Sequence, residues 1–564
     1  MNIISARRKS FVWLAASLWA CNWAVAQSGE SQVTAEAEQA CRALASSRPP
    51  GRPGAAAVNL TILSASLRNA SGSGAAYCYV RGFIPPGIQY HVQLPLPGKW
   101  NERFLHWGDG GKDGNLNFAD HRVAQGYAVA NSNMGHDAGS EPGASFGFHN
   151  RQSEIDFGHR AVHLTVNAAK TLILAYYGQA SKYSYHEGCS TGGRQGLMEA
   201  QRYPYDFDGI VAGAPVNYYQ QLNASSAWLL QRIYQDRFAG APAFDANGDG
   251  RLDSLTKLKI LERAVLQKCD AIDGITDGVI DDPHRCAFDP ETDLAGKLCP
   301  GDANADECFT RKQLQTIKDF YRGAHDSKGV RVYWGKAPGS EMDWAARFIP
   351  HPGNRFVPGS LATSGDHLNY IFYENDPGAA PPDLGDVAYK LDKRANPPEW
   401  AWWEFDIDDV TAGKGRLMMS IMDATDPDLT RFLLKKNGKL LLYHGWCDAG
   451  PAPDGTIEYF KDVVKTTFAG NLDQARQRIR LFMVPGMGHC GGGPGPNSWD
   501  RLAPLVEWVE KGKAPDFLVA THSTGGKIDN ERPLCTYPQK AVYTGPPGGQ
   551  NNPVNWVAAN FTCR

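Results

Sequence analysis

Short apolar runs alternate with a helical pattern in the first part of the chain. The runs that predict strands lie at residues 77–80, 90–94, 103–107, 127–131 and 209–214. Residues 155–177 have helical spacing, with apolar side chains at Val162, Val166 and Ala169 among others. Apolar strands that alternate with helices predict an α/β protein, in which helices cover both faces of a mostly parallel sheet.

This alternation is lost after Pro215 and returns about 200 residues later, at residues 439–445 and 479–484. The stretch between is rich in Asp, Gly, Pro and Trp and lacks regular strand–helix alternation. At 564 residues the chain is also too long for one minimal core. We therefore predict a main domain formed by residues 27–215 and 431–564, interrupted by an inserted lid domain of residues 216–430.

The N-terminus predicts an export signal over residues 1–26. Basic residues 7–9 precede a short apolar run, and Ala24 and Ala26 form a small-x-small cleavage site. A secreted or periplasmic protein is the expectation, and lipoprotein anchoring at Cys21 is the alternative. No later segment offers about 20 consecutive apolar residues, so no membrane span is predicted.

Charge and cysteine content narrow the class of protein. With 57 Lys and Arg against 60 Asp and Glu, the net charge is -3, which provides no basic field for nucleic acid. Of the 12 cysteines, 11 remain after the predicted cleavage. In an oxidising compartment most of them should form disulfides, with one left over.

The candidate nucleophile is Ser190, within the run Gly-Cys-Ser-Thr-Gly-Gly of residues 188–193. An extended, aromatic-rich run precedes it and a predicted helix follows. A serine at a strand-to-helix junction, with glycine two residues away on each side, is typical of a nucleophile elbow. The turn forces an unfavourable backbone at the serine, so its neighbours must be small. A glycine-rich surface turn is the alternative.

Two further candidates, Asp448 and His489, each follow one of the returning strands. The carboxyl ends of parallel strands form the reactive edge of such a sheet. The order Ser, Asp, His is that of α/β-hydrolases and not of the other serine triads. A histidine can take the serine proton, and the carboxylate orients and stabilises the imidazole. We therefore predict an α/β-hydrolase fold with a large inserted lid and a Ser190–His489–Asp448 triad.

A triad of this kind needs two backbone N–H groups that bind the oxyanion. Thr191, directly after the nucleophile, is placed to supply one. Gly111, in the glycine-rich loop after the strand at residues 103–107, is expected to supply the other. A plain glycine turn is the alternative for that loop.

Cysteines stand beside two triad members: Cys189 precedes the serine and Cys490 follows the histidine. If Ser190 and His489 are hydrogen-bonded, their neighbours lie within about 4–7 Å, the separation that a disulfide needs. We therefore predict a Cys189–Cys490 disulfide.

An acidic loop in the predicted lid suggests a cation site. Side chains of Asp270, Asp273 and Asp277, with the carbonyls of Ile275 and Val279, suit a hard cation such as Ca²⁺. A solvated acidic turn is the alternative. The loop at residues 245–253 opens like an EF-hand but lacks the closing Glu, so an Asn/Gly turn is favoured over a second cation site there.

The runs at residues 188–194, 208–215, 269–278 and 485–490 resemble the tannase/feruloyl esterase family, which includes mono(2-hydroxyethyl) terephthalate hydrolase. The resemblance implies an α/β-hydrolase with a large lid, a structural Ca²⁺ in the lid and hydrolysis of aromatic acid esters. It also implies the pairs Cys41–Cys78, Cys269–Cys286, Cys299–Cys308 and Cys535–Cys563, leaving Cys447 unpaired.

The predicted function is that of a secreted serine carboxylic ester hydrolase that acts on a small aromatic ester substrate of the feruloyl, galloyl or benzoate type through an acyl-enzyme. Three alternatives stay open: a terephthalate monoester hydrolase, a lipase- or peptidase-type hydrolase, and a non-catalytic, calcium-stabilised binding protein. The resemblance to the terephthalate enzyme of the family implies a carboxylate-binding arginine in the lid, and Arg355 is the candidate for it. The aromatic side chains that could stack on an acyl group, or belong to the core, are Trp344, Phe348, Tyr370, Phe372, Trp402 and Trp403.

Overall fold

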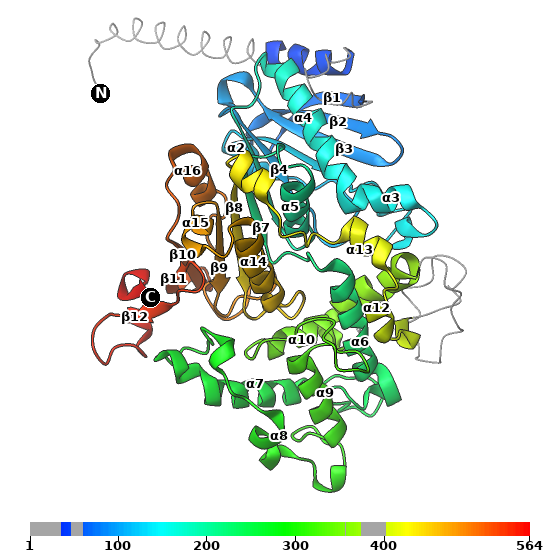
Figure 1. Cartoon of the computed structure of the whole chain (residues 1–564), viewed down its shortest axis with the longest axis vertical. Coiled ribbons are helices and arrows are strands. Elements are labelled where there is room, and N and C mark those ends of the chain that lie inside the picture. Colours follow the sequence, from blue (N-terminus) through cyan, green and yellow to red (C-terminus); the bar gives the residue numbers. More distant parts are fainter. Residues whose placement is uncertain (1–34, 47–59, 356, 374–401) are drawn as a thin grey trace, which may run out of the picture.

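The computed structural model describes residues 35–46, 60–355, 357–373 and 402–564 (Figure 1). The predicted export signal and Cys21 lie outside the described residues, so they stay predictions. No helix in the described ranges is long and apolar enough to cross a membrane.

A nine-stranded mixed sheet forms the centre of the molecule, in the order β1-β2-β3-β5-β4-β6-β7-β8-β9. Its strands are β1 (Thr61–Asn69), β2 (Ala76–Ile84), β3 (Ile88–Pro95), β4 (Arg103–Trp107), β5 (Ala128–Ser132), β6 (Tyr183–Cys189), β7 (Gly209–Gly213), β8 (Lys439–Gly445) and β9 (Ile479–Val484). The pairs from β1 to β5 are antiparallel, and those from β5 to β9 are parallel. The prediction of an α/β fold is confirmed.

Two apolar layers bury the faces of this sheet. Ile210 belongs to the layer against α4 and α5, whereas Val211 belongs to the layer against α16, because successive strand side chains point to opposite faces. The covering helices are α4 (Ala161–Tyr177), α5 (Thr191–Arg202), α14 (Pro453–Thr467) and α16 (Ala503–Lys511). Strands buried on both faces explain the continuous apolar runs, such as β8, in which every residue is buried.

The segment between β7 and β8 is mainly helical, and its part from α7 to α10 lies below the sheet in Figure 1. Its larger helices are α6 (Tyr219–Phe238), α7 (Thr256–Cys269), α9 (Arg311–Arg322), α10 (Glu341–Arg347) and α13 (Arg416–Met422). It has a core of its own, in which the buried Trp344 contacts Phe320 at 4.4 Å between ring centroids. Ala424 and Leu429, just before the predicted boundary at residue 430, already pack in the core of the sheet.

The sequence pattern did not indicate three parts of the strand structure. These are the edge strand β1, the hairpin of β10 (Phe517–Thr524) with β11 (Lys527–Cys535), and the pair of β12 (Ala541–Tyr543) with β13 (Phe561–Cys563). The nine residues of β1 are exposed or half-buried, so its strand lacks an apolar run. From β11, the buried Arg532 reaches Asp277 of the lid, at 2.7 Å between Nη2 and Oδ2.

Candidate active site

Ser190 occupies a strained turn between β6 and α5. Its φ of 63° and ψ of -120° place it in a region that non-glycine residues rarely adopt. A Cβ on Gly188 would lie 2.6 Å from the Gly192 backbone, and one on Gly193 would lie 2.4 Å from the Gly213 carbonyl oxygen. The strained backbone of Ser190 costs on the order of 1–3 kcal/mol and persists only where the surrounding structure holds it. The glycines are therefore required by close backbone approach.

Asp448 and His489 form a hydrogen-bonded pair, with 2.6 Å between Asp448 Oδ2 and His489 Nδ1. The other carboxylate oxygen of Asp448 accepts from the backbone N–H of Gly450 at 2.7 Å. Burial alone would raise the pKa of Asp448, but His489 and the hydrogen bonds from His444 and His489 hold it well below its usual range. Asp448 is therefore a carboxylate at neutral pH, as an orienting group for His489 needs to be.

A second histidine, which the sequence analysis did not single out, also contacts Asp448. Nε2 of the fully buried His444 lies 3.1 Å from Asp448 Oδ2, and its Nδ1 lies 2.7 Å from the Thr456 hydroxyl. A histidine at the end of an apolar strand has the pattern of an ordinary core residue. Only its position four residues before Asp448 could have drawn attention to it.

One cavity brings Ser190 and His489 together with both predicted oxyanion residues, Gly111 and Thr191. The hydroxyl of Thr191 donates to the Gly111 carbonyl oxygen at 2.8 Å, which ties the glycine-rich loop to the start of α5. Thr191 is the first residue of that helix, where backbone N–H groups have no partner within the helix and the dipole favours negative charge. The cavity thus combines a hydroxyl, an imidazole and an anion-binding end of a helix.

Asp109 and Gln195 fix the glycine-rich loop against α5. The buried carboxylate of Asp109 accepts from Gln195 at 2.8 Å, from Asn131 at 2.6 Å and from Asn117 at 3.2 Å. The Gln195 carbonyl in turn accepts from the Asp109 backbone N–H at 3.1 Å, and the Gly192 N–H donates to the Asp109 carbonyl at 2.8 Å. Burial and the charge of Asp113 raise the pKa of Asp109 to about 7 despite the three amides. Neither Asp109 nor Gln195 had been identified from the sequence.

A disulfide joins Cys189 to Cys490, with 5.9 Å between the Cα atoms and 301 residues of sequence separation. It links the end of β6 to the loop that carries His489. The other disulfides of the described residues are the pairs implied by the family resemblance: Cys41–Cys78, Cys269–Cys286, Cys299–Cys308 and Cys535–Cys563. Cys447 is a free, buried thiol whose Sγ donates to the Gly339 carbonyl oxygen at 2.9 Å, and burial raises its pKa.

The acidic loop of the lid has the donor atoms and the charge that suit Ca²⁺. Arg532 faces three carboxylates, with nitrogen–oxygen distances of 2.7 Å to Asp277, 3.6 Å to Asp281 and 3.9 Å to Asp273. Burial and the charges of Asp281 and Asp277 raise the pKa of Asp273 to about 7. The positive charge of Arg532 thus compensates the negative charge of the three carboxylates only in part. All side-chain donors are oxygens, the ligands of a hard cation.

The remaining predicted ligands of this loop are arranged by backbone contacts. The Asp270 carboxylate accepts from the N–H groups of Asp277 at 3.2 Å and Gly278 at 3.0 Å. Ile275 and Val279 are buried, and their N–H groups donate to Asp273 and Asp277. Within the described part of the chain, Asp270, Asp273 and Asp277 do not form a set whose oxygens all lie within 4.8 Å of one another.

The loop at residues 245–253 closes on itself as a turn. The exposed Asp245 accepts from the backbone N–H groups of Gly248 and Gly250, both at 2.7 Å. Asp253 accepts from the N–H of Ala246 at 2.7 Å. These contacts engage the same oxygens that an EF-hand would offer to a cation, which favours the Asn/Gly turn.

Arg347, and not Arg355, is the lid arginine that lines the cavity. Arg355 lies in an exposed turn with φ 54°, because the chain reverses there after a short helical turn. Four of the lid aromatics proposed as stacking residues, Trp344, Phe348, Tyr370 and Phe372, are buried in hydrophobic cores, and the aromatic side chain that lines the cavity is Tyr219. The side chain of Trp402 lies outside the described residues.

We predict that Gln195→Ala lowers kcat by roughly tenfold to a hundredfold with a smaller change in KM, because misplacement of about 1 Å in a catalytic loop can cost that much. Gln201→Ala is the matched control, since Gln201 lies on the same helix but contacts the Tyr459 hydroxyl. Steady-state kinetics on a chromogenic aromatic ester measures both variants. Equal kcat values in the two would contradict the role of Gln195.

We also predict that a Cys189→Ala, Cys490→Ala double variant loses activity at temperatures where it is still folded. In the chain-entropy model this crosslink contributes roughly 6 kcal/mol, against roughly 3 kcal/mol for Cys299–Cys308, whose sequence separation is 9 residues. The Cys299→Ala, Cys308→Ala double variant is the control and should keep its kcat. Circular dichroism monitors folding. Unchanged kinetics in the Cys189→Ala, Cys490→Ala variant would contradict the role of this disulfide in holding the active site together.

Comparison with known proteins identifies the family. The model of the family "Tannase and feruloyl esterase" matches residues 78–555. An uncharacterized esterase of Xanthomonas campestris is 34% identical over 540 residues, covering 86% of this chain and 84% of its own. The mono(2-hydroxyethyl) terephthalate hydrolase of Piscinibacter sakaiensis is 33% identical over 546 residues, covering 88% and 86%.

The fold is that of solved α/β-hydrolases in this group. The crystal structure of feruloyl esterase B from Aspergillus oryzae superposes with a TM-score of 0.75 at 24% identity, covering 93% of this chain and 100% of its own. With the α/β-hydrolase fold and these esterase relatives, this protein is a carboxylic ester hydrolase. The chain belongs to the tannase and feruloyl esterase family.

Proposed function

We propose that this protein hydrolyses esters of small aromatic acids, with Ser190 as the nucleophile, His489 as the general base and Asp448 as the orienting carboxylate. The observation that carries the proposal is the 2.6 Å contact between His489 and the buried Asp448, beside the cavity that Ser190 and His489 line together. The relatives named as feruloyl esterases and as a terephthalate ester hydrolase support the aromatic substrate class.

In acylation, Nε2 of His489 takes the proton of the Ser190 hydroxyl as Oγ attacks the ester carbonyl carbon. The Asp448 carboxylate holds the Nδ1–H tautomer and stabilises the imidazolium that forms. The N–H groups of Gly111 and Thr191 bind the oxyanion of the tetrahedral intermediate. Its collapse breaks the ester C–O bond, and the imidazolium returns the proton to the leaving alcohol.

Deacylation repeats these steps with water in place of the serine. His489 takes a proton from water, the hydroxide attacks the acyl carbon, and the proton returns to Ser190 Oγ as the aromatic acid leaves. The charge beside His489 stays fixed throughout, because the pKa of Asp448 lies well below its usual range.

A terephthalate monoester is a second candidate substrate, and two basic residues of the cavity favour it. Arg347 and Lys112 line the same cavity as Ser190, where they could face a substrate carboxylate. Burial lowers the pKa of Lys112 to about 8, and its ammonium donates to the Thr363 carbonyl oxygen at 2.7 Å. A substrate panel of methyl ferulate, methyl gallate, a terephthalate monoester and short alkyl esters, compared by kcat/KM, decides between the classes.

For the nucleophile, we predict that Ser190→Ala abolishes turnover of every ester in this panel, with loss of at least about 10³-fold in kcat. Ser420→Ala removes an exposed hydroxyl on α13 and is the control, with no change expected. Activity that survives in Ser190→Ala would show that another residue is the nucleophile. It would leave the fold assignment untouched.

We further propose that the acidic loop of the lid binds a structural Ca²⁺ through the carboxylates of Asp270, Asp273 and Asp277 and the carbonyls of Ile275 and Val279. The partly compensated charge around Arg532 supports this. The ion would supply positive charge that stabilises the lid, and no catalytic step passes through it.

For this site, we predict that chelation lowers the melting temperature by several degrees, and that added Ca²⁺ restores it in proportion to its concentration. Asp273→Asn should melt at a lower temperature and no longer respond to added Ca²⁺. Differential scanning fluorimetry measures both effects. A wild-type melting temperature that changes with neither chelator nor Ca²⁺ would contradict the proposed Ca²⁺ site.

Secretion is also part of the proposed function. Five disulfides among the described residues are typical of proteins that mature in an oxidising compartment, and residues 1–26 have the pattern of an export signal.

A further inference from the structure

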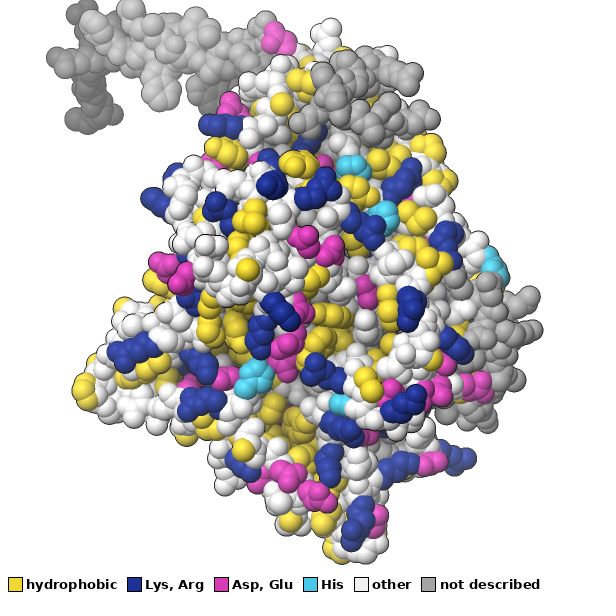
Figure 2. Space-filling view, in the orientation of Figure 1, with side chains coloured by type: hydrophobic (Ala, Val, Ile, Leu, Met, Phe, Trp, Pro, Cys, Tyr) yellow, Lys and Arg dark blue, Asp and Glu magenta, His cyan; other side chains and the backbone are white. Residues whose placement is uncertain are grey.

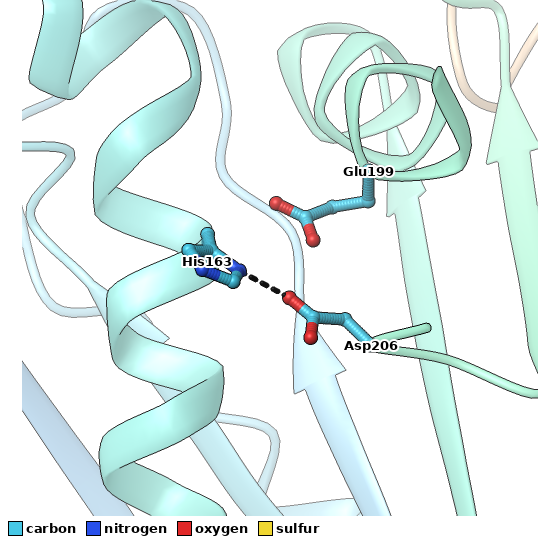
Figure 3. A group of neighbouring side chains, drawn as sticks. All are labelled: His163, Glu199 and Asp206. Atoms are coloured by element: carbon cyan, nitrogen blue, oxygen red, sulfur yellow. Dashed lines mark hydrogen bonds and ion pairs between the residues drawn. The ribbon is translucent and has the colours of Figure 1, made fainter. Parts of the chain in front are cut away.

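His163, Glu199 and Asp206 form a compact group (Figure 3). They come from α4, from α5 and from the turn between α5 and β7. Their ligand atoms all lie within 4.8 Å of one another, and Nδ1 of His163 lies 2.5 Å from Asp206 Oδ2. Glu199 stands nine residues after Ser190 on the same helix, about 13 Å further along its axis. The group therefore cannot touch the reacting atoms.

Glu199 is the unusual member of this group. Its side chain is 1% exposed, and neither of its carboxyl oxygens has a hydrogen-bond partner among the described residues. The ammonium of Lys170 donates to the backbone carbonyl of Asp206. A buried carboxylate without hydrogen bonds is strongly disfavoured. Either a proton or a cation has to neutralise this carboxyl group.

We propose that His163, Glu199 and Asp206 bind a divalent transition-metal ion of the Zn²⁺ type. One imidazole nitrogen and two carboxylates are ligands that Zn²⁺ accepts, at about 2.0–2.2 Å from each. The ring of His163 is stacked on Tyr203, with 3.9 Å between centroids and 7° between planes, which holds Nδ1 toward the two carboxylates. In Figure 3 the Glu199 carboxyl group points toward the other two side chains.

The surroundings of the group allow an ion to enter and complete its coordination with water. The side chains of His163 and Asp206 are 26% and 13% exposed, so one side of the group reaches solvent. Binding replaces the His163–Asp206 hydrogen bond and moves the two ligand atoms apart by about 1 Å, to the spacing of tetrahedral ligands. The ion would join α4, α5 and the turn before β7, and so stabilise the helix that carries the nucleophile at its other end.

The test measures Zn²⁺ binding to the folded, disulfide-bonded protein in excess Ca²⁺, which keeps the acidic loop of the lid saturated. Equilibrium dialysis with elemental analysis should find one tightly bound Zn²⁺ per chain, and Co²⁺ should give visible absorption bands that Zn²⁺ displaces. Glu199→Gln and His163→Gln should each weaken Zn²⁺ binding by at least about tenfold. Asp273→Asn, in the acidic loop, is the matched control and should bind Zn²⁺ like the wild type.

Zn²⁺ binding that is equal in the wild type and both variants would overturn the proposal. Absence of tight binding in the wild type would overturn it as well, and would mean that a proton shared between Glu199 and Asp206 neutralises the pair. If the Glu199→Gln variant does not fold, Zn²⁺ binding to the His163→Gln variant, whose substituted side chain is partly exposed, tests the proposal.

Discussion

The Cys189–Cys490 disulfide joins two parts of the candidate active site that follow widely separated strands of the sheet. Ser190 follows β6 and His489 follows β9, and two strands lie between them. At the usual spacing of strands, these strand ends are about 14 Å apart. The loop after β9 must therefore run back across the edge of the sheet. The disulfide holds the Cα of Cys490, directly after His489, 5.9 Å from the Cα of Cys189, directly before Ser190. The geometry of the proposed triad depends on this crosslink.

Two buried carboxylates stabilise the site in different ways. Asp448 faces two histidines, and its pKa is held well below its usual range, so its charge is permanent at neutral pH. Asp109 is held by amides alone, and its pKa is raised to about 7. In the proposed mechanism the first carboxylate stabilises an imidazolium, and the second holds the glycine-rich loop in place. Basic and acidic side chains are interspersed over the face seen in Figure 2.

The features that sequence could predict are those with a local physical cause. Strands buried on both faces, such as β7 and β8, have continuous apolar runs, and the elbow at Ser190 requires glycine because backbones meet there. The strained φ of 63° at Ser190 follows from the same local turn. The order of Ser190, Asp448 and His489 along the chain then specifies which strand ends must meet.

Apart from the contacts among the triad residues and their neighbouring cysteines, long-range contacts were not predictable from local pattern. The edge strand β1 is half-exposed and has no apolar run, and Arg532 reaches the lid from a hairpin that lies 255 residues later than its partner Asp277. Arg347, rather than Arg355, lines the cavity because α10 docks against the loop after Asp448, where the Ala449 N–H donates to the Asp343 carboxylate. The aromatic side chains of the lid were ambiguous because a core and an aromatic pocket have the same composition.

The most direct test of the account is to trap the covalent intermediate. The enzyme is mixed with a slowly deacylated aromatic ester, quenched in acid within the first turnover, digested and examined by mass spectrometry. The account predicts that the acyl mass is on the peptide that contains Ser190, and that the Ser190→Ala variant carries no such adduct. Turnover of the ester with an unmodified Ser190 peptide, or an acyl group on another residue, would contradict it.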